Sequence, residues 1–114
     1  MEGFMIKVFI SQPMNGMTDE QINNARDEMR ADVIAQASND FDTEDSEIEI
    51  MDTIIKDYTP NAHPLVYLGK SIEMMANADA VYFAHGWENM RGCRIEHECA
   101  KKYGKHVMYE VLPQ

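Results

Sequence analysis

The sequence predicts a single α/β domain, a flavodoxin-like or Rossmann-like three-layer sandwich with a mainly parallel sheet of four to five strands. Short apolar segments rich in β-branched residues alternate with segments of helical periodicity, in the order β-α-β-α-β-α-β. Such alternation favours a parallel sheet with helices on its faces. The chain of 114 residues has the length of one domain, so residues 1–114 are expected to fold as one unit.

The first half of the chain predicts a strand, a long helix and a second strand. The segment MIKVFISQ (residues 5–12) is apolar and ends at the turn sequence PMNG, as expected of a buried strand. Thr18 and Gln21 have the spacing of a capping box, and apolar residues then recur every three to four positions to about Ala37. An acidic, turn-rich loop follows, and EIEIM (residues 47–51) predicts the second strand.

The second half predicts two more pairs of helix and strand. A proline-containing loop precedes an amphipathic helix over residues 65–78 and a buried strand, DAVYFA, over residues 79–84. The loop HGWENMRG then leads to a helix over residues 93–103 that ends before Gly104, and the last strand covers residues 106–111. Since ligands of such folds bind at the carboxyl ends of the strands, we expect the loops after the first and third strands to form a site.

Composition excludes several classes of partner. The net charge of −10 and the lack of a basic stripe argue against binding to nucleic acid polymers, although a small phosphorylated ligand needs only one or two local cations. No apolar run approaches the ~18 residues of a membrane span, and the first residues do not have the form of a secretory signal. Sparse cysteine fits a reducing compartment, so we expect a cytoplasmic protein with no membrane partner.

Glu96 is the most informative residue of the sequence. On a helical wheel of GCRIEHECAKKY, Glu96 lies in the middle of the inward arc, which also contains Ala100 and Tyr103. The polar arc contains His97 and Glu98, so these two are expected at the helix surface. A buried ionised glutamate is costly unless it is partnered. Glu96 is therefore either held in an internal salt bridge or at the helix rim, or it is a functional carboxylate at the floor of a pocket.

A functional Glu96 admits several chemical roles. An ionised carboxylate in a small pocket suits nucleophilic attack or the stabilisation of a cationic transition state, whereas a neutral one could be a general acid. Other chemistries fit the spacing less well, because Cys93, His97 and Cys99 match neither CxxC nor HExxH. A pair of Cys93 and His97 has helical spacing but no evident third group to orient it. We expect no metal, and with no Walker or GxGxxG loop we expect no cofactor.

Two further residues are candidates for ligand contacts. Arg26 lies on the inward-leaning side of the first helix, where it could reach the SQPMNG loop and hold an anion, or pack its stem with its head in water. Trp87, in a glycine-containing loop, could stack on a base or belong to the core.

The segments KVFISQPMNGMT and ADAVYFAHGWENMRGCRIEHECAKKYGKHV resemble the nucleoside 2-deoxyribosyltransferase superfamily. More closely they resemble a small branch of it that bacteria and their phages carry. The similarity covers most of the chain and is weakest over residues 38–64. The superfamily has a glycine-bearing loop, then a glutamate, then an alanine four residues later, and here these are Gly92, Glu96 and Ala100.

The resemblance implies that Glu96 is a nucleophile that attacks C1′ of a nucleoside or nucleotide and forms a glycosyl-enzyme intermediate. Transferases pass the sugar to another base and hydrolases pass it to water. The resemblance also places the sugar and base at the loop after the first strand, and it implies a homo-oligomer, a dimer or larger. The residues of that loop expected to bind substrate are Ser11, Gln12, Pro13, Met14 and Gly16.

Two positions depart from the superfamily pattern. Ser71 stands where the transferases carry an aspartate that handles the base, and Met90 stands where they carry a second acid, although Glu88 is close. We therefore expect an N-glycosidic bond hydrolase or deoxyribosyltransferase acting through Glu96, or alternatively a non-catalytic module that binds or senses a nucleotide derivative. The remaining residues expected to bind substrate are Arg26, Ser71, Trp87, Glu88, Arg91 and Gly92, with Arg26 and Arg91 slightly favouring a phosphorylated ligand.

Overall fold

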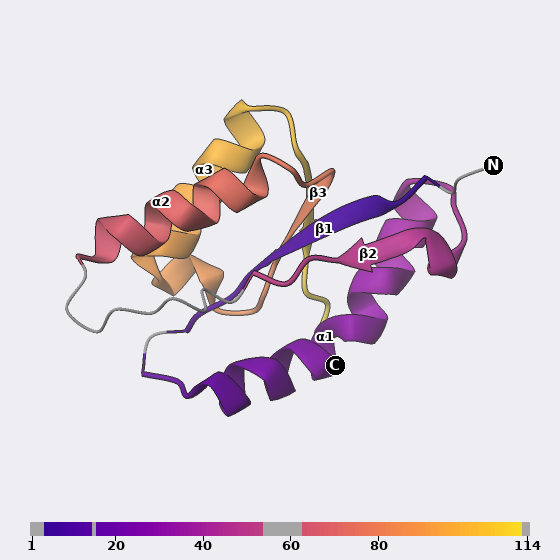
Figure 1. The fold of residues 1–114 in the computed structure, drawn as a ribbon. Coiled ribbons are helices and arrows are strands. Elements are labelled where there is room, and N and C mark those ends of the chain that lie inside the picture. Colours follow the sequence, from indigo (N-terminus) through magenta and orange to yellow (C-terminus); the bar gives the residue numbers. More distant parts are fainter. Residues whose placement is uncertain (1–3, 15, 54–62, 113–114) are drawn as a thin grey trace.

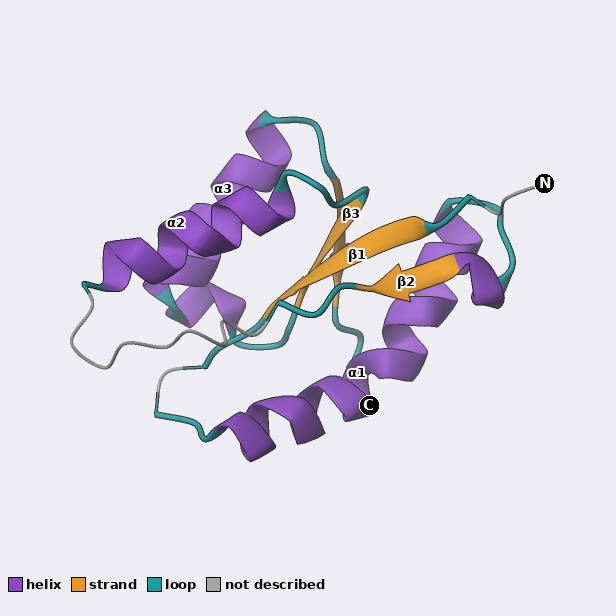
Figure 2. Cartoon of the chain, in the orientation of Figure 1, coloured by secondary structure: helices purple, strands orange, loops and turns teal. Residues whose placement is uncertain are grey.

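The computed structural model describes residues 4–14, 16–53 and 63–112 and shows an α/β domain with three helices and a four-stranded sheet (Figure 1). The elements follow one another in the order that the sequence predicts (Figure 2). The strands are β1 (Ile6–Ser11), β2 (Ile48–Ile50), β3 (Ala80–Phe83) and β4 (His106–Tyr109). The helices are α1 (Asp19–Asp40), α2 (Pro64–Met75) and α3 (Arg91–Lys102), with 3-10 turns at η1 (Asp45–Glu47) and η2 (Trp87–Asn89).

The sheet is parallel throughout, in the order β2-β1-β3-β4. Its register pairs Ile6 with Ile48 on one side of β1 and Val8 with Ala80 on the other. The chain moves from β1 outward to β2 and then returns past β1 to β3, so the strand order reverses between β1 and β3. In open α/β sheets, ligands bind at the carboxyl ends of the strands at such a reversal.

Helices cover both faces of the sheet, which confirms the predicted three layers (Figure 1). On one face, α1 packs Met29, Val33 and Ala37 against alternate residues of the central strands. On the other face, α2 and α3 contribute Met75 and Ala100 to a second cluster. Since β1 and β3 are covered on both faces, their side chains are buried on both except for the exposed Lys7, which explains why β3 and residues 8–10 of β1 are continuous apolar runs.

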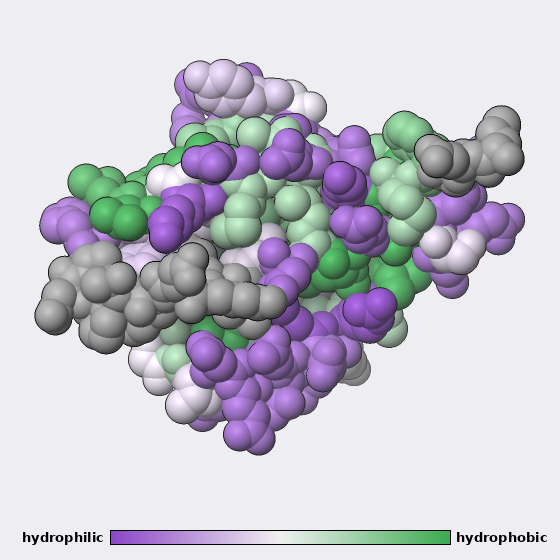
Figure 3. Space-filling model, viewed as in Figure 1, coloured by the Kyte–Doolittle hydropathy of each residue, from purple (hydrophilic) through white to green (hydrophobic). Residues whose placement is uncertain are grey.

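The predicted start of α1 is confirmed in detail. The Thr18 hydroxyl accepts a hydrogen bond from the Gln21 backbone N–H at 3.1 Å, and the Gln21 side chain accepts one from the Thr18 N–H at 2.9 Å. The helix runs to Asp40 rather than to about Ala37, because the Phe41 N–H continues the helical bonding to the Ala37 carbonyl. Hydrophilic side chains cover the outer face of this helix (Figure 3).

Two expectations at the C-terminal end of the chain were wrong. Tyr103 does not belong to the buried face of α3, because the helix ends at Lys102 and the Tyr103 side chain is 84% exposed. The last strand ends at Tyr109, since the Val111 N–H leaves the sheet and bonds to the Asp32 carboxylate at 3.1 Å. Within the described part of the chain, no helix combines the length and apolarity that crossing a membrane requires.

Candidate active site

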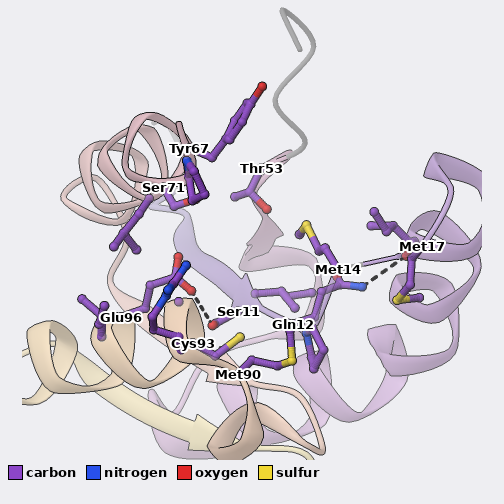
Figure 4. A pocket seen from close by; sticks show the side chains of 18 of the residues that line it. Ser11, Gln12, Met14, Met17, Thr53, Tyr67, Ser71, Met90, Cys93 and Glu96 are labelled. Atoms are coloured by element: carbon purple, nitrogen blue, oxygen red, sulfur yellow. Dashed lines mark hydrogen bonds between the residues drawn. The ribbon is translucent and has the colours of Figure 1, made fainter. Parts of the chain in front are cut away.

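A cavity of about 1150 Å³ lies beside the carboxyl end of β1 (Figure 4). Its walls come from the end of β1 and the loop after it, the start of α1, the segment after β2, α2 as far as Ser71 and the first half of α3. Small-molecule pockets usually enclose roughly 300–1,000 Å³, so this cavity is large enough for a small-molecule ligand. It lies where the strand order reverses, as the fold predicts.

Glu96 is buried in the floor of this cavity, with only 7% of its surface exposed. The Ser11 hydroxyl at the end of β1 donates a hydrogen bond to Glu96 Oε1 at 2.7 Å (Figure 4). The Ser71 hydroxyl on α2 lines the same cavity and lowers the pKa of the Glu96 carboxyl. Side chains from three elements that are distant in the sequence therefore meet at one carboxylate, and its inward direction confirms the prediction from the helical wheel.

Two opposing effects set the protonation of Glu96. Burial raises the pKa of the Glu96 carboxyl above its ordinary value, because removal from water disfavours the charged form. The hydrogen bonds from Ser11 and Ser71 favour the ionised form and lower the pKa in part. The result is a more basic and less hydrated carboxylate than one at the surface, which is suited to nucleophilic attack.

The Cys93 thiol lies one turn before Glu96 and is buried in the same wall. Burial raises the pKa of this thiol, the nearby Ser11 hydroxyl lowers it in part, and the negative charge of Glu96 raises it further. Reactive cysteines instead need a lowered pKa, so Cys93 is a packing group rather than a nucleophile. Cys93 and Cys99 are both free thiols.

A second group of polar side chains borders the cavity beside the end of β1. Arg26 on α1 donates from Nε to Gln12 Oε1 at 2.6 Å, and from Nη2 to the Thr53 hydroxyl. Gln12 donates in turn from Nε2 to the Ile22 carbonyl at 3.4 Å. Burial lowers the pKa of Arg26, while the charge of Asp52 acts in the opposite direction. Arg26 thus joins the loop after β1 to the segment after β2, as its predicted reach allows.

The α2 side of the cavity is mainly apolar. Leu65, Tyr67 and Leu68 line it from the first turns of the helix, and Ile95 lines it from α3. Leu65 is 66% exposed, and apolar residues gather over the start of α2 (Figure 3). A flat, apolar ligand part could pack against this wall.

Nine of the predicted site residues line the cavity. Arg26 does not appear in the wall itself but contacts it through Gln12 and Thr53. The nine residues that the structure brings together are Ser11, Gln12, Pro13, Met14, Gly16, Ser71, Arg91, Gly92 and Glu96.

The structure places Trp87 and Glu88 outside the residues that line the cavity. Gly86 has a left-handed backbone (φ 90°) and starts the turn that directs Trp87 away from the cavity. The Trp87 ring stacks on His97, with ring centroids 4.1 Å apart, and lies 5.4 Å from the Phe83 ring. His97 lies at the helix surface as expected, but the Trp87 ring covers it in part, so its side chain is half-buried. Glu88 is exposed.

Thr53, Asp19 and Tyr67 are among the cavity residues that were not singled out from the sequence. Thr53 follows β2 directly, and its position at the carboxyl end of a parallel strand was a usable signal. Asp19 and Tyr67 line the cavity from the first turns of α1 and α2, and no sequence pattern distinguishes them from other polar or aromatic residues in a first turn. Among the residues described, no three His, Cys, Asp or Glu side chains form a group that could hold a metal ion.

The comparisons with known proteins place the chain in a family without assigning it a chemistry. Residues 6–109 match the family described as "Domain of unknown function (DUF4406)", so the chain belongs to that family. No curated protein matches the chain.

Proposed function

We propose that this protein cleaves the N-glycosidic bond of a nucleoside or nucleotide, with Glu96 as the nucleophile. The observation that carries the proposal is the buried Glu96 carboxylate, held by hydroxyl groups from two other elements at the floor of a cavity of ligand size. The resemblance to the nucleoside 2-deoxyribosyltransferase superfamily, which has a glutamate nucleophile at this position, supports the same assignment.

In the proposed reaction, a Glu96 carboxylate oxygen attacks C1′ of the sugar and forms a glycosyl ester. The bond between C1′ and the base nitrogen breaks, and the base leaves with the electron pair and takes up a proton. Water then attacks C1′ of the ester, which releases the free sugar and restores the carboxylate, or a second base attacks and a new nucleoside forms. Ser11 and Ser71 fix the carboxylate in one orientation, which reduces the entropic cost of reaching the attack geometry.

A second candidate function is a non-catalytic module that binds or senses a nucleotide derivative. The observation that favours it is the position of Met90, an apolar side chain in the cavity wall where the related transferases carry an acid. Glu88, the nearest replacement in the sequence, is outside the cavity lining. Binding without release of base would be the signature of this module.

The test is the release of free base, measured by chromatography after incubation with a panel of nucleosides and nucleotides. The proposal predicts that one or more of them lose base, and that Glu96→Gln stops the release while the variant keeps its fold and its ligand affinity. Addition of a second free base separates a transferase, which makes a new nucleoside, from a hydrolase, which makes free sugar. Saturable binding with no base released by the unmodified protein would establish the second candidate instead.

A further inference from the structure

The hydrogen-bond pattern around Arg26 fixes which groups of Gln12 and Thr53 can meet a ligand. A guanidinium group carries only donors, so every atom that it contacts must accept. Arg26 Nε lies 2.6 Å from one atom of the Gln12 amide, which must therefore be the oxygen. The other amide atom lies 3.4 Å from the Ile22 carbonyl, which can only accept, so that atom must be the nitrogen. Both contacts require the same amide orientation, and a flipped amide would lose both.

Thr53 is oriented by the same reasoning. Its hydroxyl oxygen accepts a hydrogen bond from Arg26 Nη2, so its own proton points away from the guanidinium. Thr53 is only 4% exposed, and it lines the cavity together with Gln12. Gln12 Nε2 has two protons, and the Ile22 carbonyl accepts one of them. Gln12 and Thr53 therefore each keep one donor, an N–H and an O–H, that their contacts with Arg26 and Ile22 do not use.

The half-buried position of Arg26 between buried Gln12 and buried Thr53 stabilises this arrangement. The charge of Asp52 partly balances the guanidinium, and Gln12 and Thr53 each accept one of its hydrogen bonds. Reversing either acceptor would place a donor against the half-buried guanidinium, which is costly. The orientation of the Gln12 amide is thus set by the protein, and the Thr53 hydroxyl keeps its proton on the side away from Arg26.

We propose that Thr53 and Gln12 form a donor subsite, oriented by Arg26, that selects ligands bearing an acceptor oxygen. The proposal rests on the function above, because it places the ligand in the Glu96 cavity. The strongest such acceptors of a nucleotide are a base carbonyl and a phosphate. An amino group at the same position would meet the Gln12 N–H and could donate only to the second lone pair of the Thr53 oxygen, so it would bind less tightly. Thr53 and Gln12 are specificity residues, and Arg26 is a positioning residue that acts through them.

The experiment measures ligand affinity in Glu96→Gln protein, where base release cannot consume the probe. The base arm compares 2′-deoxyinosine with 2′-deoxyadenosine, and 2′-deoxyuridine with 2′-deoxycytidine. The phosphate arm compares each nucleoside with its 5′-monophosphate. Thr53→Val, added to this protein, removes the O–H at nearly constant volume, and Thr53→Ser keeps it as the matched control.

We expect Thr53→Val to weaken the preferred probes by about 3- to 10-fold, the range of one net hydrogen bond, and Thr53→Ser to retain their affinity. A carbonyl preference that disappears in Thr53→Val assigns the subsite to the base, and a phosphate preference that disappears assigns it to the phosphate. Probes that bind with the same affinity to all three proteins would overturn the subsite while leaving the proposed function intact. Failure of every probe to bind, with no base released by the unmodified protein, would overturn both.

Discussion

Two charges of opposite sign lie at the same cavity, the buried Glu96 in its floor and the half-buried Arg26 behind its wall, and the chain accommodates them differently. Arg26 is satisfied by the acceptors of Gln12 and Thr53 and is partly balanced by the charge of Asp52. Glu96 is held by the neutral hydroxyls of Ser11 and Ser71, and its burial raises the pKa of the carboxyl. Arg26 therefore serves as a fixed structural element, whereas Glu96 retains reactivity that an ion pair would have reduced. Four substitutions test this contrast.

Glu96→Gln should have the largest effect. Removal of a catalytic nucleophile costs on the order of a thousandfold or more in kcat/KM. The free energy of unfolding, in contrast, should not fall at neutral pH when Glu96 is replaced by Gln. The folded pKa of Glu96 is raised, so its favourable contribution is present below the ordinary carboxyl pKa and is lost as pH rises through the folded pKa. At neutral pH the amide should thus leave the melting temperature unchanged or higher.

The measurement for Glu96→Gln combines base release with thermal denaturation at several pH values. The stability of the variant relative to the unmodified protein should increase from acid to neutral pH. Full activity in Glu96→Gln would remove Glu96 from the mechanism. A large loss of stability at neutral pH would show that the carboxylate is a structural ion instead.

Arg26→Met should lower the free energy of unfolding by about 2 kcal/mol, because it removes two hydrogen bonds from a charged donor and leaves Gln12 Oε1 and Thr53 without them. Chemical denaturation measures this change. Arg30→Met is the matched control, since Arg30 is an exposed arginine one turn further along α1 and surface changes usually stay within about 0.5 kcal/mol. Equal effects of the two substitutions would show that the Arg26 network does not support the fold.

Ser11→Ala should have a smaller effect on stability, about 1 kcal/mol for one lost hydrogen bond. The effect of Ser11→Ala that tests the proposal is a change in the pH dependence of kcat/KM. The proposed reaction requires ionised Glu96, so kcat/KM should fall as pH drops through the raised pKa of that carboxyl. Loss of the Ser11 donor raises this pKa further and should move the acid limb to higher pH. Ser46→Ala, at an exposed position, should leave the limb unchanged.

Trp87→Phe should have the smallest effect on the site. The Trp87 ring stacks on His97 and lies outside the cavity lining, so the substitution should leave ligand affinity and kcat/KM within about twofold. Stability should decrease by about 1 kcal/mol, the typical value of an aromatic pair. Isothermal titration and thermal denaturation separate these outcomes. A tenfold loss of ligand affinity would restore Trp87 as a base-stacking residue.

The sequence predicted more of the fold than of the site. Apolar runs and helical periodicity located all four strands and three helices of the described chain, because these patterns follow directly from burial of one or both faces. The predicted bounds of helices and strands were wrong at their ends, because a single cap or hydrogen bond determines where an element ends. The Val111 N–H, for example, pairs with Asp32 and so ends β4 early. Local patterns contain no information about such a distant partner.

The sequence by itself determined that Glu96 points inward, because the position of a residue on a helix face depends only on helical geometry. It also placed the loop after β1 at the site, because parallel strands end at one edge of the sheet. Only the tertiary structure decided what surrounds Glu96. The pairing with Ser11 spans 85 positions of sequence, and Ser71 reaches the same carboxylate from a third element.

The tertiary structure also decided whether Trp87 and Thr53 belong to the cavity, because local sequence could not. A tryptophan in a glycine-containing loop fits a ligand contact and a core contact equally well, and the left-handed Gly86 decided for packing against His97. Thr53 became a site residue because Arg26, from another element, orients its hydroxyl beside the cavity. Hydrogen-bond direction depends on the partners in space, and the sequence leaves those partners open until the chain folds.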